Sequence, residues 1–87
     1  MYEVRYKNSV KKDLNKIGRE ESLKVIQKIK TKLAKSPKDL GIPLKGQDGT
    51  LWRYRAGDYR VVYSFNDNEL WILVIKIGHR KEIYKKI

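Results

Sequence analysis

The chain has 87 residues, and 21 lysines and arginines against 10 aspartates and glutamates give it a formal net charge of +11. A chain this short buries only about 60% of the surface that its unfolded form exposes, so we expect one domain spanning residues 1–87 and no large cofactor fold. Its 40% of hydrophobic residues exclude a disordered tail, and its lack of cysteine excludes disulfides and thiolate metal sites and favours the reducing cytoplasm.

The first residues predict a strand and a short helix. Residues 2–7 alternate between apolar and charged side chains, as a half-buried strand does. Three apolar residues then recur at helical spacing: Val10, Leu14 and Ile17. Gly18 is expected to end this helix, because glycine readily adopts the backbone conformation found at helix C-termini.

A second helix is predicted from Glu20, and the Ser36-Pro37 pair ends it. Four apolar residues at helical spacing form the stripe expected to face the core: Leu23, Ile26, Ile29 and Leu33. Because few residues separate the two helices, we expect a helical hairpin. Residues 36–50 contain both prolines and three of the six glycines, which predicts a loop.

From Leu51 onward the pattern is typical of strands joined by tight turns. The expected strands are residues 51–55, 59–65 and 69–77, with Gly57-Asp58 and residues 66–68 as the turns. The last strand holds a nearly continuous apolar run, Leu70 to Ile75, which predicts a central strand covered on both faces. This run is far shorter than the roughly 20 apolar residues of a membrane span, so no membrane partner is expected. Arg80 to Lys86 is expected to form a short C-terminal helical turn.

The element order β-α-α-β-β-β predicts an α+β fold. In this fold the helical hairpin packs on one face of a small, mainly antiparallel sheet, because helices of this length are marginal alone. The other face is then free for a ligand. If the aromatic sides of the strands over residues 51–55 and 59–65 pack on the helices, three arginines converge on the free face: Arg53, Arg55 and Arg60. Trp52, Trp71 and Phe65 are expected in the core.

Functional-type side chains concentrate in the second half of the chain: Arg53, Arg55, Arg60, His79, Arg80 and Tyr84. Guanidinium groups bind phosphate through paired hydrogen bonds, and the positive charge attracts polyanions such as RNA, DNA or an acidic protein segment. His79 is the natural proton-transfer candidate. Three alternatives stay open: the arginines pair with Asp58, Asp67 and Glu69, His79 only caps the last strand, and Tyr84 packs on the core.

Three segments of the second half closely resemble the RelE/ParE superfamily of toxins: Leu44-Lys45-Gly46, then residues 51–63 (LWRYRAGDYRVVY), then residues 77–84 (IGHRKEIY). The length, the basic charge and the element order agree with that superfamily. RelE-like members cleave messenger RNA in the ribosomal decoding site, whereas ParE-like members inhibit DNA gyrase.

The resemblance implies the toxin of a type II toxin–antitoxin system, a ribosome-dependent endoribonuclease that uses neither metal nor cofactor. The messenger 2′-hydroxyl would attack the adjacent phosphate. The implied catalytic residues are Arg55, Arg60, His79, Arg80 and Tyr84, and the implied RNA-binding residues are Arg53, Lys45 and Lys81. Some relatives carry lysines where this chain has Arg53 and Arg55, and arginine is a poor general base, so the proton acceptor is not assigned.

The implied partners are an acidic cognate antitoxin in a higher-order complex, and the ribosome with its messenger RNA. The helical lysines would contact ribosomal RNA. Two alternatives to the nuclease are a toxin that inhibits gyrase and an inactive family member that only binds its antitoxin.

Overall fold

The computed structural model describes residues 1–44 and 50–86, which form a five-stranded sheet and its helices. The strands are β1 (Glu3–Tyr6), β2 (Ile42–Pro43), β3 (Trp52–Ala56), β4 (Tyr59–Asn66) and β5 (Trp71–His79). The helices are α1 (Val10–Ile17), α2 (Arg19–Thr31), α3 (Pro37–Leu40) and the 3-10 turns η1 (Leu33–Lys35) and η2 (Ile83–Lys86). None of these helices is long and apolar enough to cross a membrane.

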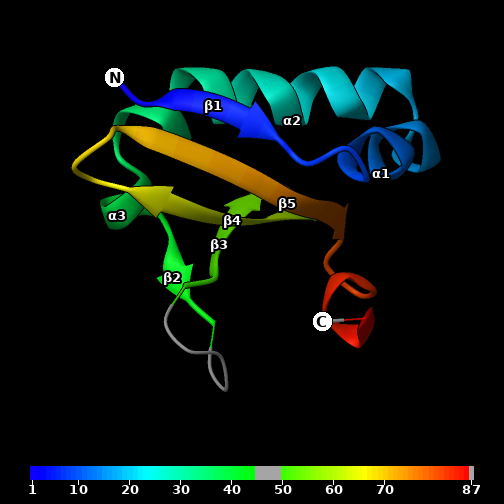
Figure 1. Ribbon diagram of the computed structural model, residues 1–87. Helices are drawn as coiled ribbons and strands as arrows, with labels where there is room; N and C mark the ends of the chain where they lie inside the picture. The colour runs from blue at the N-terminus through cyan, green and yellow to red at the C-terminus, as the bar shows by residue number, and fades with distance from the viewer. Residues whose placement is uncertain (45–49, 87) are drawn as a thin grey trace.

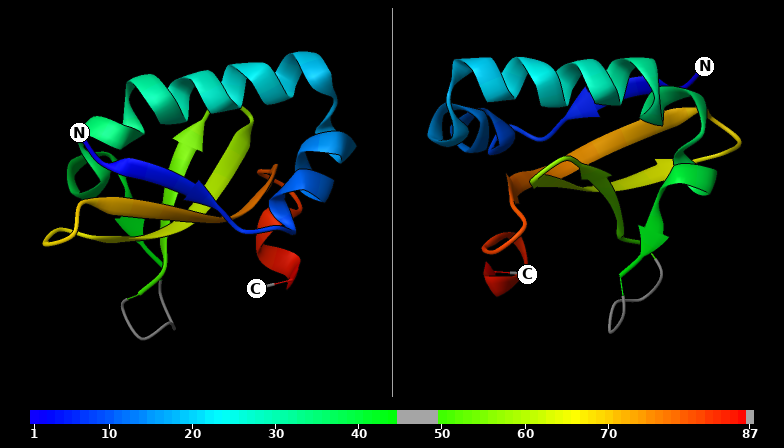
Figure 2. Two further views of the ribbon diagram at one scale, coloured as in Figure 1. Left: turned by 45° about the horizontal axis from the view of Figure 1, so that its top comes forward. Right: turned by 180° about the vertical axis from the view of Figure 1, so that it is seen from behind.

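The sheet has the strand order β1-β5-β4-β3-β2 (Figure 1). Strand β1 runs parallel to β5, and the other neighbours are antiparallel. Helices α1 and α2 lie on one side of the sheet, while η2 and the end of β2 lie toward the other (Figure 2). The predicted α+β fold, a helical hairpin on a mainly antiparallel sheet with a C-terminal helical turn, is therefore confirmed.

The core lies between the hairpin and the sheet. Its buried apolar side chains come from both layers: Val10, Val25, Ile29 and Leu33 from the helical layer, and Tyr54, Val61, Tyr63, Ile72, Val74 and Ile77 from the strands. Gly18 separates α1 from α2 with a φ of 93°, a conformation that glycine adopts without strain. The predicted end of the first helix is thus confirmed.

The buried face of α2 differs from the predicted stripe. Leu23 is 58% exposed, whereas Ser22, Val25 and Ile29 are buried. The Ser22 hydroxyl donates a hydrogen bond of 2.7 Å to the Leu14 carbonyl, and this bond lets a polar side chain occupy the contact between α1 and α2. Because each residue turns a helix by about 100°, Leu23 then faces away from the sheet.

The prolines and glycines of residues 36–50 predicted a loop, but the described part of this segment contains a short helix and a short strand. Pro37 begins α3, where its missing N–H costs nothing because a first-turn N–H has no partner within the helix. Strand β2 follows and pairs Ile42 with Arg53 and Pro43 with Trp52. Both elements are too short for a periodic pattern, so the turn-forming residues dominate the sequence signal.

Strand β5 is buried mainly on one face, and its predicted two-sided burial is wrong. Ile72, Val74 and Ile77 are buried, but Trp71 is only half-buried. The Trp71 ring lies 5.7 Å from the Arg5 guanidinium carbon, and its Nε1 donates to the Glu69 carboxylate at 2.8 Å. The prediction of Trp71 in the core is therefore also wrong. The side chain stacks beneath a cation instead.

The strand with neighbouring residues buried on both faces is β4, in which Val61, Val62 and Tyr63 are all nearly inaccessible. The register between β4 and β5 shifts between Val62 and Tyr63, where β5 bulges. Near this bulge the Asp13 carboxylate of α1 accepts the Ile77 N–H at 3.1 Å. This hydrogen bond connects β5 to α1. Strand β5 ends at His79, two residues beyond its predicted end.

Candidate functional site

The face of the sheet opposite α1 and α2 carries the predicted arginines. The register pairs Arg55 with Arg60, and paired residues of antiparallel strands point to the same side. Arg53 lies two residues before Arg55 in β3 and shares that side. These arginines line one hollow of about 150 Å³, whose walls are Leu40, Ile42, Arg53, Arg55 and Arg60. The structure therefore brings together the three arginines that the strand pattern had placed on the free face.

Arg60 is the most firmly held of the three. Its side chain is 9% exposed, and its Nη1 donates to the carbonyl oxygens of Gly57 at 2.8 Å and Tyr59 at 2.9 Å. Gly57 has a φ of 63°, which a tight turn between antiparallel strands requires. Arg60 thus fixes the turn between β3 and β4, and the turn in return fixes the guanidinium.

Arg53 contacts Tyr84 of η2. Its Nη1 donates to the Tyr84 hydroxyl at 3.3 Å, and its guanidinium carbon lies 5.9 Å from the centre of the tyrosine ring. Tyr84 is 38% exposed, so it does not pack on the core, which was the alternative for this residue. The buried Ile83 beside it anchors η2 by packing against Gly78.

Arg80 approaches the same turn that Arg60 holds. Its N–H donates to the Asp58 carbonyl at 2.8 Å, and its Nε lies 4.0 Å from the Asp58 carboxylate. Within the described residues Arg53, Arg55 and Arg60 form no such pair, so the alternative of strand arginines paired with carboxylates does not hold there. Lys81 is exposed beside Arg80, and Lys45 lies outside the described residues.

His79 does not reach the arginine hollow. It pairs with Tyr59 across β4 and β5, and the two rings meet edge to face at 5.7 Å on the helix-covered side. Its Nδ1 accepts the Lys81 N–H at 3.2 Å. It lines a separate hollow of about 420 Å³, which Asp13 and Glu82 share. The alternative, in which this histidine caps the end of the last strand, is confirmed.

The sequence did not predict the apolar wall formed by Leu40 and Ile42. A buried hydrogen bond of 2.6 Å from the Tyr63 hydroxyl to the Pro37 carbonyl holds this wall in place. Burial raises the pKa of Tyr63 far above its usual value. A Cβ on Gly41 would overlap the Tyr63 hydroxyl, so only glycine fits there. One proline and one glycine four residues apart are not a specific pattern, so the sequence carries no signal for this arrangement.

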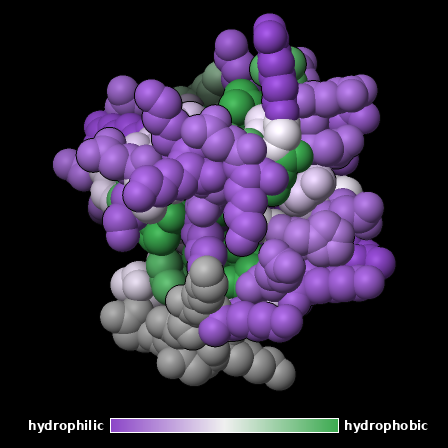
Figure 3. All heavy atoms as spheres, turned by 90° about the vertical axis from the view of Figure 1, so that its right-hand side faces the viewer, coloured by the Kyte–Doolittle hydropathy of each residue, from purple (hydrophilic) through white to green (hydrophobic). Residues whose placement is uncertain are grey.

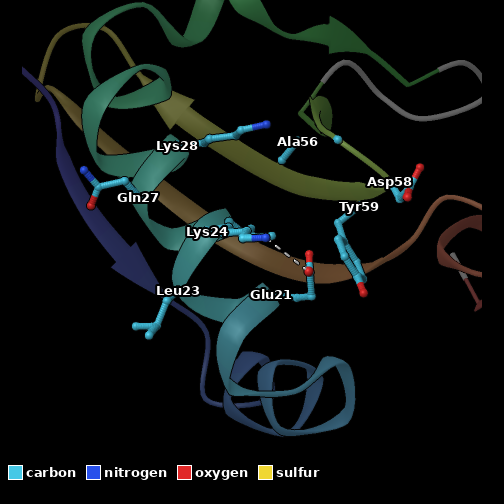
Figure 4. Close-up of a pocket in the computed structure, with 10 residues that line it drawn as sticks. Glu21, Leu23, Lys24, Gln27, Lys28, Ala56, Asp58 and Tyr59 are labelled. Atoms are coloured by element: carbon cyan, nitrogen blue, oxygen red, sulfur yellow. Dashed lines mark ion pairs between the residues drawn. The ribbon is translucent and has the colours of Figure 1, made fainter.

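A third and larger hollow of about 640 Å³ lies between α2 and the turn from β3 to β4 (Figure 4). Lys24 and Lys28 point across it toward the strands, whereas Leu23 points away from them (Figure 4). Lys24 forms an ion pair of 3.6 Å with Glu21. This hollow therefore carries both signs of charge.

Hydrophilic side chains dominate the surface beside the C-terminal turn, with apolar atoms visible mainly in the gaps between them (Figure 3). No carboxylate is among the residues that line the arginine hollow in the described part of the chain. Residues 1–44 and 50–86 also contain no cluster of three metal-ligating side chains. The arrangement suits an anion that presents several oxygen atoms, such as a phosphodiester.

The model of a family described as the ParE toxin of type II toxin–antitoxin systems matches residues 4–84. Toxin RelG of Mycobacterium tuberculosis is 26% identical over 85 residues, which are 98% of each chain. Toxin RelE of the same organism is 29% identical over 84 residues, which are 97% of this chain and 87% of the relative.

Solved structures show the same fold. The toxin-antitoxin complex RelBE2 from Mycobacterium tuberculosis matches with a TM-score of 0.83 and 25% identity, over 91% of this chain and 98% of the other. A metal-bound toxin from Helicobacter pylori matches with a TM-score of 0.73 and 25% identity, over 97% and 100%. The isolated RelE toxin of E. coli matches with a TM-score of 0.70 and 22% identity, over 99% and 94%.

Proposed function

The chain belongs to the ParE toxin family of type II toxin–antitoxin systems, within the RelE/ParE superfamily. We propose that it cleaves messenger RNA in the decoding site of the ribosome, and its similarity to toxins RelG and RelE supports this proposal. The observation that carries this proposal is the hollow lined by Arg53, Arg55 and Arg60 with no lining carboxylate among the described residues. Three convergent guanidiniums suit a phosphodiester that gains negative charge during its cleavage.

In the proposed reaction the 2′-oxygen bonds to the adjacent phosphorus while the bond from phosphorus to the 5′-oxygen breaks. The products are a 2′,3′-cyclic phosphate and a 5′-hydroxyl, so the proton lost by the 2′-hydroxyl is balanced by one gained at the 5′-oxygen. The five-coordinate transition state carries more negative charge than the ground state. Fixed guanidiniums therefore stabilise it preferentially, which lowers the barrier.

The arginines of the hollow and the neighbouring Arg80 and Tyr84 each have a proposed role. Arg60 and Arg55 clamp the scissile phosphate, and the two carbonyl contacts of Arg60 orient it before the substrate arrives. Arg80, exposed at the same turn, contacts the transition state or the leaving group. Arg53 binds the RNA backbone, and Tyr84 beside it stacks on a base.

Ribosome dependence follows from the lack of an evident proton acceptor in this hollow. His79 lies on the other face of the sheet, and guanidinium groups do not accept protons at physiological pH. We therefore propose that the ribosome orients the 2′-hydroxyl for in-line attack. Correct positioning of the reacting groups can by itself lower the reaction barrier substantially. The exposed lysines of α1 and α2 would contact ribosomal RNA.

The test maps messenger cleavage by primer extension, with and without ribosomes. We expect cuts only in the presence of ribosomes. Equal cleavage of naked RNA would contradict ribosome dependence. Gln27→Ala, a change in the hollow beside α2, serves as the control for Arg55→Ala, and only the arginine variant should lose the cuts.

The family's name favours a second candidate, inhibition of DNA gyrase, because the matching model describes ParE toxins. A gyrase supercoiling assay run beside the cleavage map separates the two. Full inhibition of supercoiling with no messenger cuts would establish this second function in place of the first.

As a type II toxin, the protein has an antitoxin partner, and solved relatives include toxin-antitoxin complexes. We propose an acidic antitoxin whose segment folds across the arginine face, because a net charge of +11 and an open sheet face leave an unneutralised anion site. Co-expression with the neighbouring reading frame should restore growth. A folded toxin that is harmless on its own would contradict this proposal.

A further inference from the structure

Two large apolar side chains are exposed at the edge of the arginine hollow. Leu40 at the end of α3 is 45% exposed and Ile42 in β2 is 53% exposed, and both line the hollow together with Arg53, Arg55 and Arg60. Exposed apolar side chains that sit singly on a surface need no explanation. Two such side chains in one wall, beside three cations, require an explanation.

The wall is held rigidly in place beside the arginines. Ile42 is the register partner of Arg53, so the two side chains stand next to each other on one face of the sheet. The segment before Ile42 is held by the hydrogen bond from Tyr63 to the Pro37 carbonyl and by the close approach of Gly41 to the Tyr63 hydroxyl. The apolar wall is therefore part of the hollow, and its placement does not depend on a partner.

We propose that Leu40 and Ile42 bind the face of one nucleobase of the RNA whose phosphate the arginines hold. This inference rests on the proposed function, because it takes RNA as the ligand. Bases that leave a single-stranded stack are bound against aromatic or apolar side chains. Aliphatic side chains have no hydrogen-bond donor or acceptor, so the wall would contact the apolar face of the base without distinguishing one base from another.

The hollow is smaller than a pocket that encloses a whole ligand. Its volume of about 150 Å³ is below the roughly 300–1,000 Å³ of pockets that enclose drug-sized ligands. A phosphate on the guanidiniums and one base against Leu40 and Ile42 account for the two kinds of lining side chain.

The wall and Tyr84 reach Arg53 from different directions. Ile42 adjoins Arg53 on the β2 side of β3, whereas Tyr84 belongs to η2, which follows β5 on the other side (Figure 1). A phosphate at Arg53 then has one binding element on each side. Two successive nucleotides would be splayed apart, with one base on Tyr84 and its neighbour on the apolar wall.

The test measures binding of the N-terminally labelled toxin to ribosomes programmed with messenger RNA. A 2′-deoxyribose at the cleavage position blocks the reaction, and each decoding-site base in turn is replaced by an abasic nucleotide. The variants are Leu40→Gln and Ile42→Thr, the second of which keeps the β-branched shape that suits a strand. Leu23→Gln is the matched control, since Leu23 is 58% exposed on the other side of the sheet.

We expect each wall variant to bind the intact messenger about five- to tenfold more weakly, toward the low end of the range for a base contact. One abasic position should weaken the wild type to the same extent and abolish the difference between wild type and wall variants. Leu23→Gln should match the wild type on every RNA, and thermal unfolding should show that all variants are folded.

Equal binding by wall variants and wild type on intact RNA would overturn the base site while leaving the proposed function standing. A loss that persists on every abasic RNA would overturn it too, because the wall would then act on the backbone or on the fold. If the wild type does not bind programmed ribosomes, or if Arg55→Ala binds them as tightly as the wild type does, the proposed function itself fails and the base site with it.

Discussion

Two of the hollows lie on opposite sides of the sheet, and they differ in size and in charge. The one between α2 and the turn from β3 to β4 is about 640 Å³, and its Lys24 is paired with Glu21. The one on the open face is only about 150 Å³ but is lined by three arginines and no carboxylate among the described residues. The candidate site is therefore distinguished by its three neighbouring arginines without a lining carboxylate in the described part of the chain, and not by the volume of the hollow.

The two hollows share one structural element. Gly57 and Asp58, which form the turn from β3 to β4, line the larger hollow. From the other side Arg60 holds the Gly57 carbonyl and Arg80 holds the Asp58 carbonyl. The turn thus belongs to both surfaces, and substitutions on either side test whether the two are functionally separate.

The largest expected effect is that of Arg60→Ala. Losing one preorganised cation should lower the single-turnover rate of messenger cleavage by on the order of 10²-fold or more. Arg60→Lys keeps the charge but cannot reproduce the planar guanidinium, and should recover only part of the rate. Gln27→Ala, on the other hollow, should leave the rate unchanged. A rate for Arg60→Ala within about threefold of wild type would remove this residue from the catalytic set.

The second prediction concerns the segment that carries the apolar wall. Gly41→Ala places a Cβ in the space of the Tyr63 hydroxyl, and overpacking of this kind lowers the free energy of unfolding by about 1–3 kcal/mol. Tyr63→Phe in the same chain removes the overlapping hydroxyl and should restore part of the loss. Urea unfolding of the single and double variants measures this coupling. Simple additivity of the two losses would show that the contact is not the cause.

Tyr84 offers a smaller effect on the open face. Tyr84→Ala should weaken binding to programmed ribosomes by about tenfold, because a stacked base loses its platform. Tyr84→Phe keeps the ring and loses only the 3.3 Å hydrogen bond from Arg53, so it should bind nearly as well as the wild type. If the two variants bind equally weakly, the hydroxyl is what matters and the stacking role is wrong.

The smallest effect is a dependence of stability on alkaline pH. Burial raises the pKa of Tyr63 in the folded protein above the value near 10 of an unfolded chain. The unfolded state then loses its proton first, so the contribution of Tyr63 to the free energy of unfolding is constant below about pH 10 and falls as the pH rises above it. Melting temperatures at about pH 9 and pH 11 should differ less in Tyr63→Phe than in wild type. An equal difference would assign the slope to other groups.

Much of the fold follows from local pattern. The alternation over residues 2–7, the helical spacing from Val10 and the turn at Gly57 each predicted an element that the structure contains. These signals are reliable because each depends on neighbouring residues only. The convergence of Arg53, Arg55 and Arg60 was predictable for the same reason, since strand alternation and a tight turn settle which side chains share a face.

The errors arose where contacts between distant segments decide the outcome. Leu23 faces solvent because Ser22 bonds to α1, and Trp71 leaves the core because Arg5 and Glu69 meet it on the open face. His79 ends on the helix-covered side because β5 bulges near Ile77 and continues past Gly78.

By itself the sequence determined the family of this protein, the order of its first strand, its two longer helices and its last three strands, and the arginines of its open face. It did so because these depend on residue types and on spacings of two to four residues. Only the tertiary structure decided that Tyr84 meets Arg53, that Arg60 braces a turn, and that Leu40 and Ile42 complete the hollow. The contact of Tyr84 depends on the docking of η2 against Gly78, and the placement of Leu40 and Ile42 depends on the pairing of β2 with β3. No local pattern encodes such long-range contacts.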